Sequence, residues 1–99
     1  MTNAQTYENL PELRNLPHWA LSNDSKSIHR TWKMRDFSTA VDFIGVIRDA
    51  AEGMDHHPDI HLTGYRNLEI ELSTHSAGGL TSKDFELAAK IEALYKRFK

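Results

Sequence analysis

The apolar residues between positions 36 and 53 recur at the spacing of an amphipathic helix. Asp36 is a suitable N-cap for this helix, and Gly53 is a plausible terminator. The apolar positions are Phe37, Ala40, Val41, Ile44, Ile47 and Ala51. Such a stripe predicts a helix that packs one face on a core.

A second amphipathic helix is predicted from Thr81 onward. Residues 81–84 read Thr-Ser-Lys-Asp, a capping box in which Asp84 stands where Glu or Gln is commoner. Its apolar stripe consists of Leu87, Ile91, Leu94 and Phe98. A short helix is also predicted near the start of the chain, where Pro11 and Pro17 limit its length. Its apolar positions are Leu10, Leu13 and Leu16.

Alternation of apolar and polar residues predicts a strand over residues 67–75. One face carries Leu68, Ile70, Leu72 and Thr74, and the other carries Glu69, Glu71, Ser73 and His75. Two earlier runs, 18–21 and 27–34, are rich in strand-forming residues, and the polar segment 22–26 between them suits a hairpin turn. One face of the second run is apolar and suited to burial, although Arg30 interrupts it. The apolar residues of this face are Ile28, Trp32 and Met34.

The order of elements is therefore helix, strand, strand, helix, one or more strands, helix. Strands joined by hairpins favour an antiparallel sheet with helices on one face, so the sequence predicts an α+β fold in a single domain, residues 1–99. The other face of the sheet, which carries Glu71 and Ser73, either contacts solvent or meets a second subunit. Four aromatic residues occupy positions typical of a core: Trp19, Trp32, Phe37 and Phe43.

The composition excludes several classes of protein. Hydrophobic residues make up 39% and charged residues 26% of the chain, and no apolar run approaches the roughly 18 residues of a membrane-spanning helix. The absence of cysteine excludes disulfides, thiolate catalysis and iron–sulfur clusters. A net charge of −2 gives no electrostatic footprint for nucleic acid. The first residues do not resemble a secretory signal, so a cytoplasmic location is expected.

The histidines are the most unusual feature of the composition. Six are present, and four of them lie within twenty residues: His56, His57, His61 and His75. Pro58 cannot continue the preceding helix, so it places His56 and His57 on a turn. Imidazoles near acidic residues such as Asp59 and Asp84 are suited to general acid–base chemistry. We therefore predict that histidines of this segment share one pocket.

Other interpretations of these residues stay open. His57 and His61 have four-residue spacing, but it presents both rings to one metal only on a helix, and Pro58 lies between them. Asp84 can cap its own helix as well as orient a histidine. The Gly78-Gly79 pair is more typical of a tight turn than of a phosphate-binding loop. His18 and His29 are expected in contact with solvent, whereas His61 either contacts solvent or faces the pocket.

Three segments carry a resemblance to a known family. They are Asp-His-His-Pro-Asp at 55–59, Glu-Ile-Glu-Leu-Ser-Thr-His at 69–75 and Gly-Gly-Leu-Thr-Ser-Lys-Asp at 78–84. In this order they resemble the signature of the pterin-4a-carbinolamine dehydratase family, whose pattern nearly the whole chain fits from Trp19 onward. The resemblance implies a four-stranded antiparallel sheet with helices on one face, assembled into a homodimer or homotetramer.

The resemblance also implies an activity. It is the dehydration of 4a-hydroxytetrahydropterin to quinonoid dihydropterin, which serves tetrahydrobiopterin recycling and uses neither a metal nor an organic cofactor. By the resemblance, His56 and His75 form the catalytic acid–base pair, and Asp84 tunes or orients one of them. The implied substrate-binding residues are His57, Pro58 and Ser73. We accordingly expect the imidazoles of residues 56, 57 and 75 to converge on one cleft.

The chain departs from the commonest family pattern between residues 59 and 67. The usual aromatic residue after His-His-Pro is absent, and the segment is one residue longer, which a bulge or a longer turn must absorb. This form also resembles a branch of the family that includes Rubisco assembly factors. The alternative function is therefore that of a non-catalytic dehydratase-like protein, either a Rubisco assembly factor with Rubisco as its client or another protein-binding module. A third function, transcriptional co-activation, is known for animal members and has no specific support in these residues.

Overall fold

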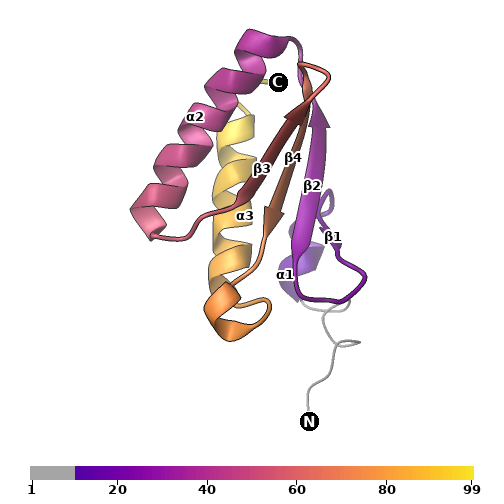
Figure 1. The fold of residues 1–99 in the computed structure, drawn as a ribbon, viewed down its shortest axis with the longest axis vertical. Helices are drawn as coiled ribbons and strands as arrows, with labels where there is room; N and C mark the ends of the chain where they lie inside the picture. Colours follow the sequence, from indigo (N-terminus) through magenta and orange to yellow (C-terminus); the bar gives the residue numbers. More distant parts are fainter. Residues whose placement is uncertain (1–10) are drawn as a thin grey trace.

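Figure 1 shows two long helices, α2 and α3, packed against an antiparallel sheet. The computed structural model describes residues 11–99. Its helices are α1 (Pro11–Arg14), α2 (Phe37–Met54) and α3 (Ser82–Tyr95), and its strands are β1 (Ala20–Leu21), β2 (Ile28–Lys33), β3 (Asp59–Thr63) and β4 (Asn67–Leu72). The predicted α+β class is confirmed, with a four-stranded sheet in the order β1-β2-β4-β3.

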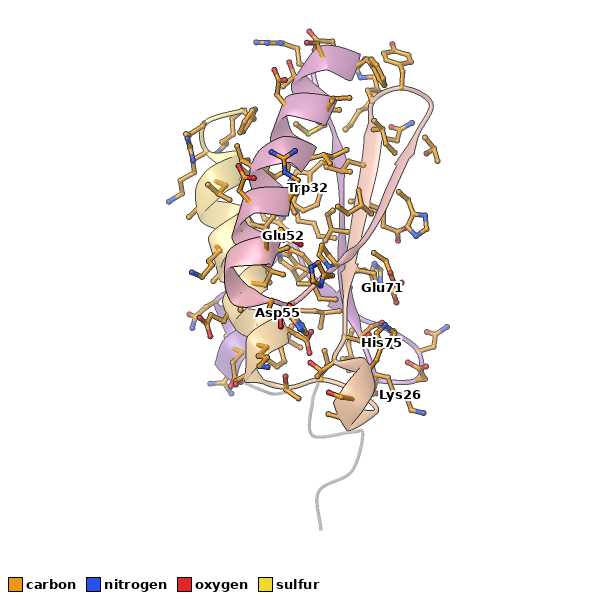
Figure 2. The ribbon with its side chains drawn as sticks, turned by 60° about the vertical axis from the view of Figure 1, so that its left-hand side comes forward. Lys26, Trp32, Glu52, Asp55, Glu71 and His75 are labelled. Carbon is orange, nitrogen blue, oxygen red and sulfur yellow. The ribbon has the colours of Figure 1, made fainter. Side chains whose placement is uncertain are left out.

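The central strands β2 and β4 place one face of the sheet toward the helices. Their register is continuous from Ile28 opposite Leu72 to Lys33 opposite Asn67. The side chains buried on this face are Ile28, Trp32, Leu68, Ile70 and Leu72. Figure 2 shows the sheet nearly edge-on, with α2 and α3 on one side only. The alternation of apolar and polar residues predicted for the strand at 67–75 is therefore confirmed as far as Leu72.

Arg30 lies on the buried side of β2, where it interrupts the apolar pattern. Its guanidinium pairs with Glu92 of α3. It also lies 4.5 Å from the centre of the Trp32 ring and 5.2 Å from that of the Tyr95 ring. Glu92 accepts a further hydrogen bond from the Trp19 indole N–H at 2.8 Å. A cation that is paired and stacked on aromatic rings is tolerated at the edge of a core, which explains the interruption.

Helix α2 begins as predicted but ends later. Asp36 caps it by accepting a hydrogen bond from the Thr39 backbone N–H at 2.7 Å. The helix continues through Gly53, so the prediction of Gly53 as its terminator was wrong. The terminating residue is Asp55, whose backbone is left-handed with φ of 52° and whose N–H bonds back to carbonyls of the last turn.

The buried stripe of α2 is narrower than the sequence pattern predicts. It includes Ala40, Phe43, Ile47 and Ala51. Phe37 and Val41 lie on its flank and are 55% and 44% exposed. The prediction that Phe37 is a core residue was therefore wrong, whereas the other predicted aromatic core residues are buried: Trp19, Trp32 and Phe43. No helix in the described part of the chain is long and apolar enough to cross a membrane.

The first described elements are shorter than their sequence patterns. The predicted helix is the single turn α1 followed by the buried Leu16, and Leu10 lies outside the described residues. Strand β1 covers only two residues of the predicted run 18–21. The predicted hairpin with β2 is confirmed, and the Ser22 N–H donates to the Ser27 carbonyl across its turn at 2.9 Å.

Candidate functional site

The connection between α2 and β3 buries His56. After Asp55 ends the helix, the His56 N–H donates to the Ala51 carbonyl at 3.1 Å, and the residue is 9% exposed. The ring Nε2 lies 2.7 Å from Oδ1 of Asp84, in the first turn of α3. The structure thus brings two of the predicted site residues into direct contact.

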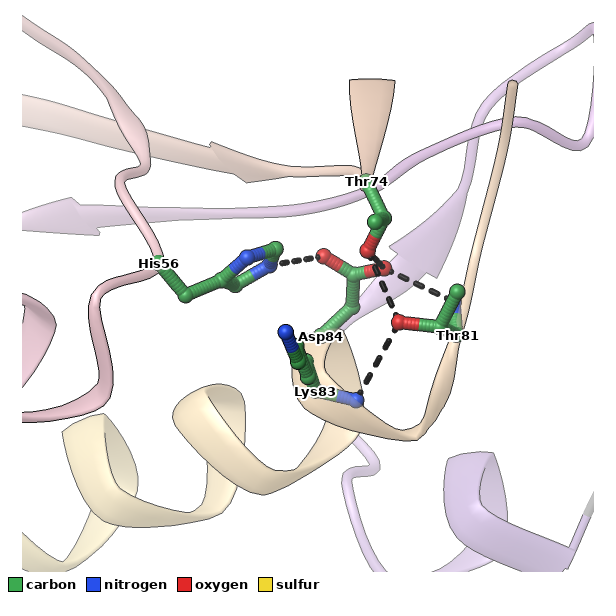
Figure 3. Close-up of polar contacts among 5 residues, drawn as sticks. All are labelled: His56, Thr74, Thr81, Lys83 and Asp84. Atoms are coloured by element: carbon green, nitrogen blue, oxygen red, sulfur yellow. Dashed lines mark hydrogen bonds and ion pairs between the residues drawn. The ribbon is translucent and has the colours of Figure 1, made fainter. Parts of the chain in front are cut away.

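Asp84 is fully buried and is held through both carboxylate oxygens (Figure 3). Besides the contact of Oδ1 with His56, Oδ2 accepts from the Thr74 hydroxyl and from the Thr81 backbone N–H, each at 2.9 Å. The Thr81 hydroxyl oxygen lies 2.8 Å from that of Thr74 and accepts from the Lys83 N–H at 3.3 Å. The capping box is confirmed, and the same carboxylate both caps α3 and contacts a histidine.

Strand β4 ends before the position predicted for it, His75. Thr74 forms an isolated bridge with Gly79, with N–H to O distances of 3.0 and 3.3 Å in the two directions. The bridge closes a loop in which His75–Ala77 form a 3₁₀ turn and Gly78 is left-handed with φ of 72°. The placement of His75 on the strand was therefore wrong, because this bridge turns the chain one residue earlier.

His75 lines a hollow of about 550 Å³. The walls come from the β1–β2 turn, the start of β3, the end of β4 and the Gly78-Gly79 pair, and Ser73 is among them. Figure 2 shows Lys26, Glu71 and His75 on the side of the sheet that faces away from α2. The hollow therefore opens on the face of the sheet that the helices leave uncovered.

Two acidic side chains of this hollow are fixed by neighbouring serines. Oε2 of Glu71 accepts from the Ser27 hydroxyl at 2.5 Å. Asp24 accepts from the Ser22 hydroxyl at 2.7 Å and from the Lys26 N–H at 3.0 Å. The hydrogen bond from Ser22, followed by that from Lys26, lowers the pKa of Asp24 below its ordinary 3.8. At neutral pH this wall therefore offers a charged hydrogen-bond acceptor.

His57 is turned toward solvent. Its side chain is 60% exposed, and its Nε2 lies 2.6 Å from Oε2 of Glu52, in the last turn of α2. Neither His56 nor His57 lines the hollow of His75. The expected convergence of the three imidazoles on one cleft is therefore not what this chain shows. Instead, His56 is joined to Asp84, and His75 lies in the hollow.

His61 lies apart from these residues on β3. It is exposed and lines a second hollow of about 310 Å³ together with Glu69, so it lies outside the hollow of His75. His18 is also exposed, and His29 is partly so. Residues 11–99 contain no group of three or more His, Cys, Asp or Glu side chains placed to hold a metal ion. The structure thus gives no support to a metal shared by His57 and His61.

The connection between β3 and β4 is a short turn, residues 64–66. The two strands pair in continuous register up to Thr63 opposite Asn67. In the connection, Gly64 and Tyr65 are both left-handed, with φ of 53° and 57°. The continuous register has no bulge between Asp59 and Thr63, and accommodation of the extra residue in a longer turn stays a prediction.

Three side-chain contacts of this region were not predicted from the sequence. They are the pairs Glu52–His57, Ser27–Glu71 and Thr74–Asp84. A sequence signal exists for part of one of them, because the capping-box pattern identified Asp84 as a side chain that accepts hydrogen bonds. The serine and threonine partners come from other elements and carry no local pattern.

Comparison with known protein families assigns the chain. A family model described as pterin 4 alpha carbinolamine dehydratase matches residues 1–94. The chain belongs to this family. A carbinolamine dehydratase relative from Arabidopsis thaliana, pterin-4-alpha-carbinolamine dehydratase 2, mitochondrial, is 45% identical over 84 residues, or 83% of this chain and 45% of that protein. A putative pterin-4-alpha-carbinolamine dehydratase of Saccharolobus islandicus (strain M.14.25 / Kamchatka #1) is 42% identical over 87 residues, or 88% of this chain and 86% of that protein.

Two solved structures related to the carbinolamine dehydratase family share the fold. The transcriptional coactivator/pterin dehydratase from Brucella Melitensis has a TM-score of 0.81 and 34% identity, with 95% of this chain and 96% of that one covered. A pterin dehydratase-like protein identified as a RuBisCO assembly factor in the alpha-carboxysome has a TM-score of 0.64 and 17% identity, with 77% and 87% covered. The second likeness shows the fold alone.

Proposed function

We propose that this protein dehydrates 4a-hydroxytetrahydropterin to quinonoid dihydropterin by histidine acid–base catalysis, as a step of tetrahydrobiopterin recycling. One observation carries the proposal. A buried histidine, His56, contacts the buried carboxylate of Asp84. Asp84 also accepts from Thr74, which immediately precedes the second histidine, His75. Membership of the carbinolamine dehydratase family supports the substrate class.

The reaction requires an acid and a base. The bond between C4a and the hydroxyl oxygen breaks, and the oxygen leaves as water once the acid has protonated it. The base takes a proton from a ring N–H, and the ring electrons form the new carbon–nitrogen double bond. His56 and His75 are the proposed pair, in opposite protonation states and in either order. Each such group contributes typically ~10²–10⁴-fold, and Asp84 orients the ring of His56.

The hollow lined by His75 is the proposed binding site of the pterin. Its volume of about 550 Å³ falls within the range of small-molecule sites, roughly 300–1,000 Å³. Ser73 lines the hollow, and so does Asp59, which directly follows Pro58. His57 and Pro58 are therefore proposed to contact the pterin from the α2–β3 connection.

The dehydration rate of 4a-hydroxytetrahydropterin in the presence of the purified protein tests this function. We expect His56→Ala and His75→Ala each to lower kcat by about 10²-fold or more, because each removes a proton-transfer group. His61→Ala is the matched control and should keep the wild-type rate, since this exposed histidine lines a separate hollow on β3. The proposal fails if the wild-type protein does not accelerate dehydration.

The alternative function is a non-catalytic module that assists the assembly of Rubisco. Its support from structure is a fold likeness at 17% identity. The buried contact of His56 with Asp84 favours the enzyme, because a binding scaffold has no evident use for an oriented imidazole. The yield of assembled Rubisco in cells with and without the protein separates the two functions, and an unchanged yield excludes the Rubisco assembly role.

We also propose that the protein forms a homodimer or homotetramer through sheet edges and helices. Strand β3 is an edge strand, and α2 exposes Phe37 and Val41. Unpaired strand edges and exposed apolar side chains are suited to contacts between copies. Light scattering would measure the mass, and a monomer would contradict this proposal. The cytoplasmic location stays a prediction, to be tested by imaging the tagged protein in its own cell.

A further inference from the structure

The geometry around His56 points to a positioning role for two threonine hydroxyls. We infer that the side chains of Thr74 and Thr81 fix the direction of a hydrogen-bond chain that makes Nδ1 of His56 the atom exchanging a proton with the substrate. The functional part of this inference rests on the proposed dehydratase activity, whereas its structural part can be tested without catalysis.

The hydrogen bonds of this chain run in one direction. An ionised Asp84 accepts and cannot donate, so the single hydroxyl hydrogen of Thr74 points to Oδ2, 2.9 Å away. The Thr74 oxygen then accepts the hydroxyl hydrogen of Thr81 at 2.8 Å. The Thr81 oxygen in turn accepts from the Lys83 N–H at 3.3 Å. Figure 3 shows these contacts. The sequence of donors ends on the carboxylate of Asp84.

The surroundings of Asp84 stabilise its negative charge. The residue lies in the first turn of α3, where the helix dipole favours an anion. Oδ2 accepts from one O–H and one N–H group. Because Asp84 is fully buried, water does not take the place of these donors. Oδ1 is therefore an acceptor for His56, and Nε2 of that ring carries the hydrogen.

The consequence is that His56 has one reactive ring atom. With Nε2 bound to Asp84, only Nδ1 is free to accept a proton as a base or to donate one as an acid. Removing the Thr74 hydroxyl leaves Oδ2 with a single donor, from the Thr81 backbone. The carboxylate and the ring are then less firmly held, so the population of the productive tautomer should fall.

Thr74→Val tests this role because valine matches the shape of threonine and lacks the hydroxyl, while Thr74→Ser restores the donor. Thr31→Val, at an exposed threonine of β2, is the control. Long-range proton–nitrogen NMR of the neutral form of His56 should show its Nε2–H tautomer in the wild type. In Thr74→Val we expect a loss of this tautomer's dominance and a kcat about tenfold lower at nearly unchanged KM. Thr74→Ser should recover both properties.

Two results would overturn the inference. One is a wild-type His56 with its hydrogen on Nδ1, and this measurement decides the matter even if Thr74→Val does not fold. The other is a folded Thr74→Val protein with the wild-type tautomer and kcat. A tautomer change in a protein without dehydratase activity would support the hydrogen-bond chain and would refute only the proposed function.

Discussion

Among single residues, substitution of Glu71 gives the sharpest test of the proposed pterin-binding site. The Ser27 hydroxyl holds its carboxylate within the hollow. We expect Glu71→Gln to raise KM about tenfold at similar kcat, because an amide replaces a charged acceptor for the ring N–H groups of the pterin. Glu69→Gln, on the same strand but outside this hollow, is the matched control. Equal KM values for the two variants in steady-state kinetics would place the pterin elsewhere.

The sequence predicted the faces of such residues but not their partners. Alternation along the strand assigns the side chains of Glu71 and Thr74 to opposite faces. In the structure both residues line the hollow, and the Thr74 side chain contacts the buried Asp84. Their partners, Ser27 and Asp84, lie 44 and 10 residues away along the chain. Periodicity reports the direction of a side chain along its own element. It carries no information on the side chain that another element places opposite.

Among the elements, alanine substitutions of two glycines should have opposite effects on stability, because Gly64 lies in a turn and Gly53 lies in a helix. Gly64→Ala should lower the free energy of unfolding by about 1 kcal/mol or more, because φ is +53° and the added Cβ would lie 2.8 Å from the Asn67 side chain. Gly53→Ala should raise it by about 0.5–1 kcal/mol, since Gly53 lies within α2 and a Cβ there meets nothing within 4 Å. Urea denaturation measures both, and changes of the same sign would contradict this assignment of turn and helix.

The starts of elements were predictable, and several of their ends were not. Asp36 and Thr81 cap helices through hydrogen bonds to the next few residues, so a short sequence window contains the whole signal. The end of β4 depends on the bridge between Thr74 and Gly79, and Thr74 also binds Asp84. The strand therefore stops because of contacts outside it, and alternation alone extended it to His75.

In the whole molecule, the antiparallel topology places the candidate site at one end of the sheet. Ile28 lies opposite Leu72 and Asp59 lies opposite Glu71, so the starts of β2 and β3 and the end of β4 lie together (Figure 1). The order of helices and strands predicted this class of fold. It did not predict that His57 would face solvent, because that position depends on its contact with Glu52.

The most direct test of a site shared by His56 and His75 is a titration with an unreactive oxidised pterin, followed through the NMR signals of the histidine rings. We expect the rings of His56 and His75 to respond together and to saturate at the same pterin concentration. The rings of His18 and His61, which line other hollows of the molecule, should stay unchanged. A response of only one member of the pair, or an equally strong response of His61, would contradict a shared acid–base site.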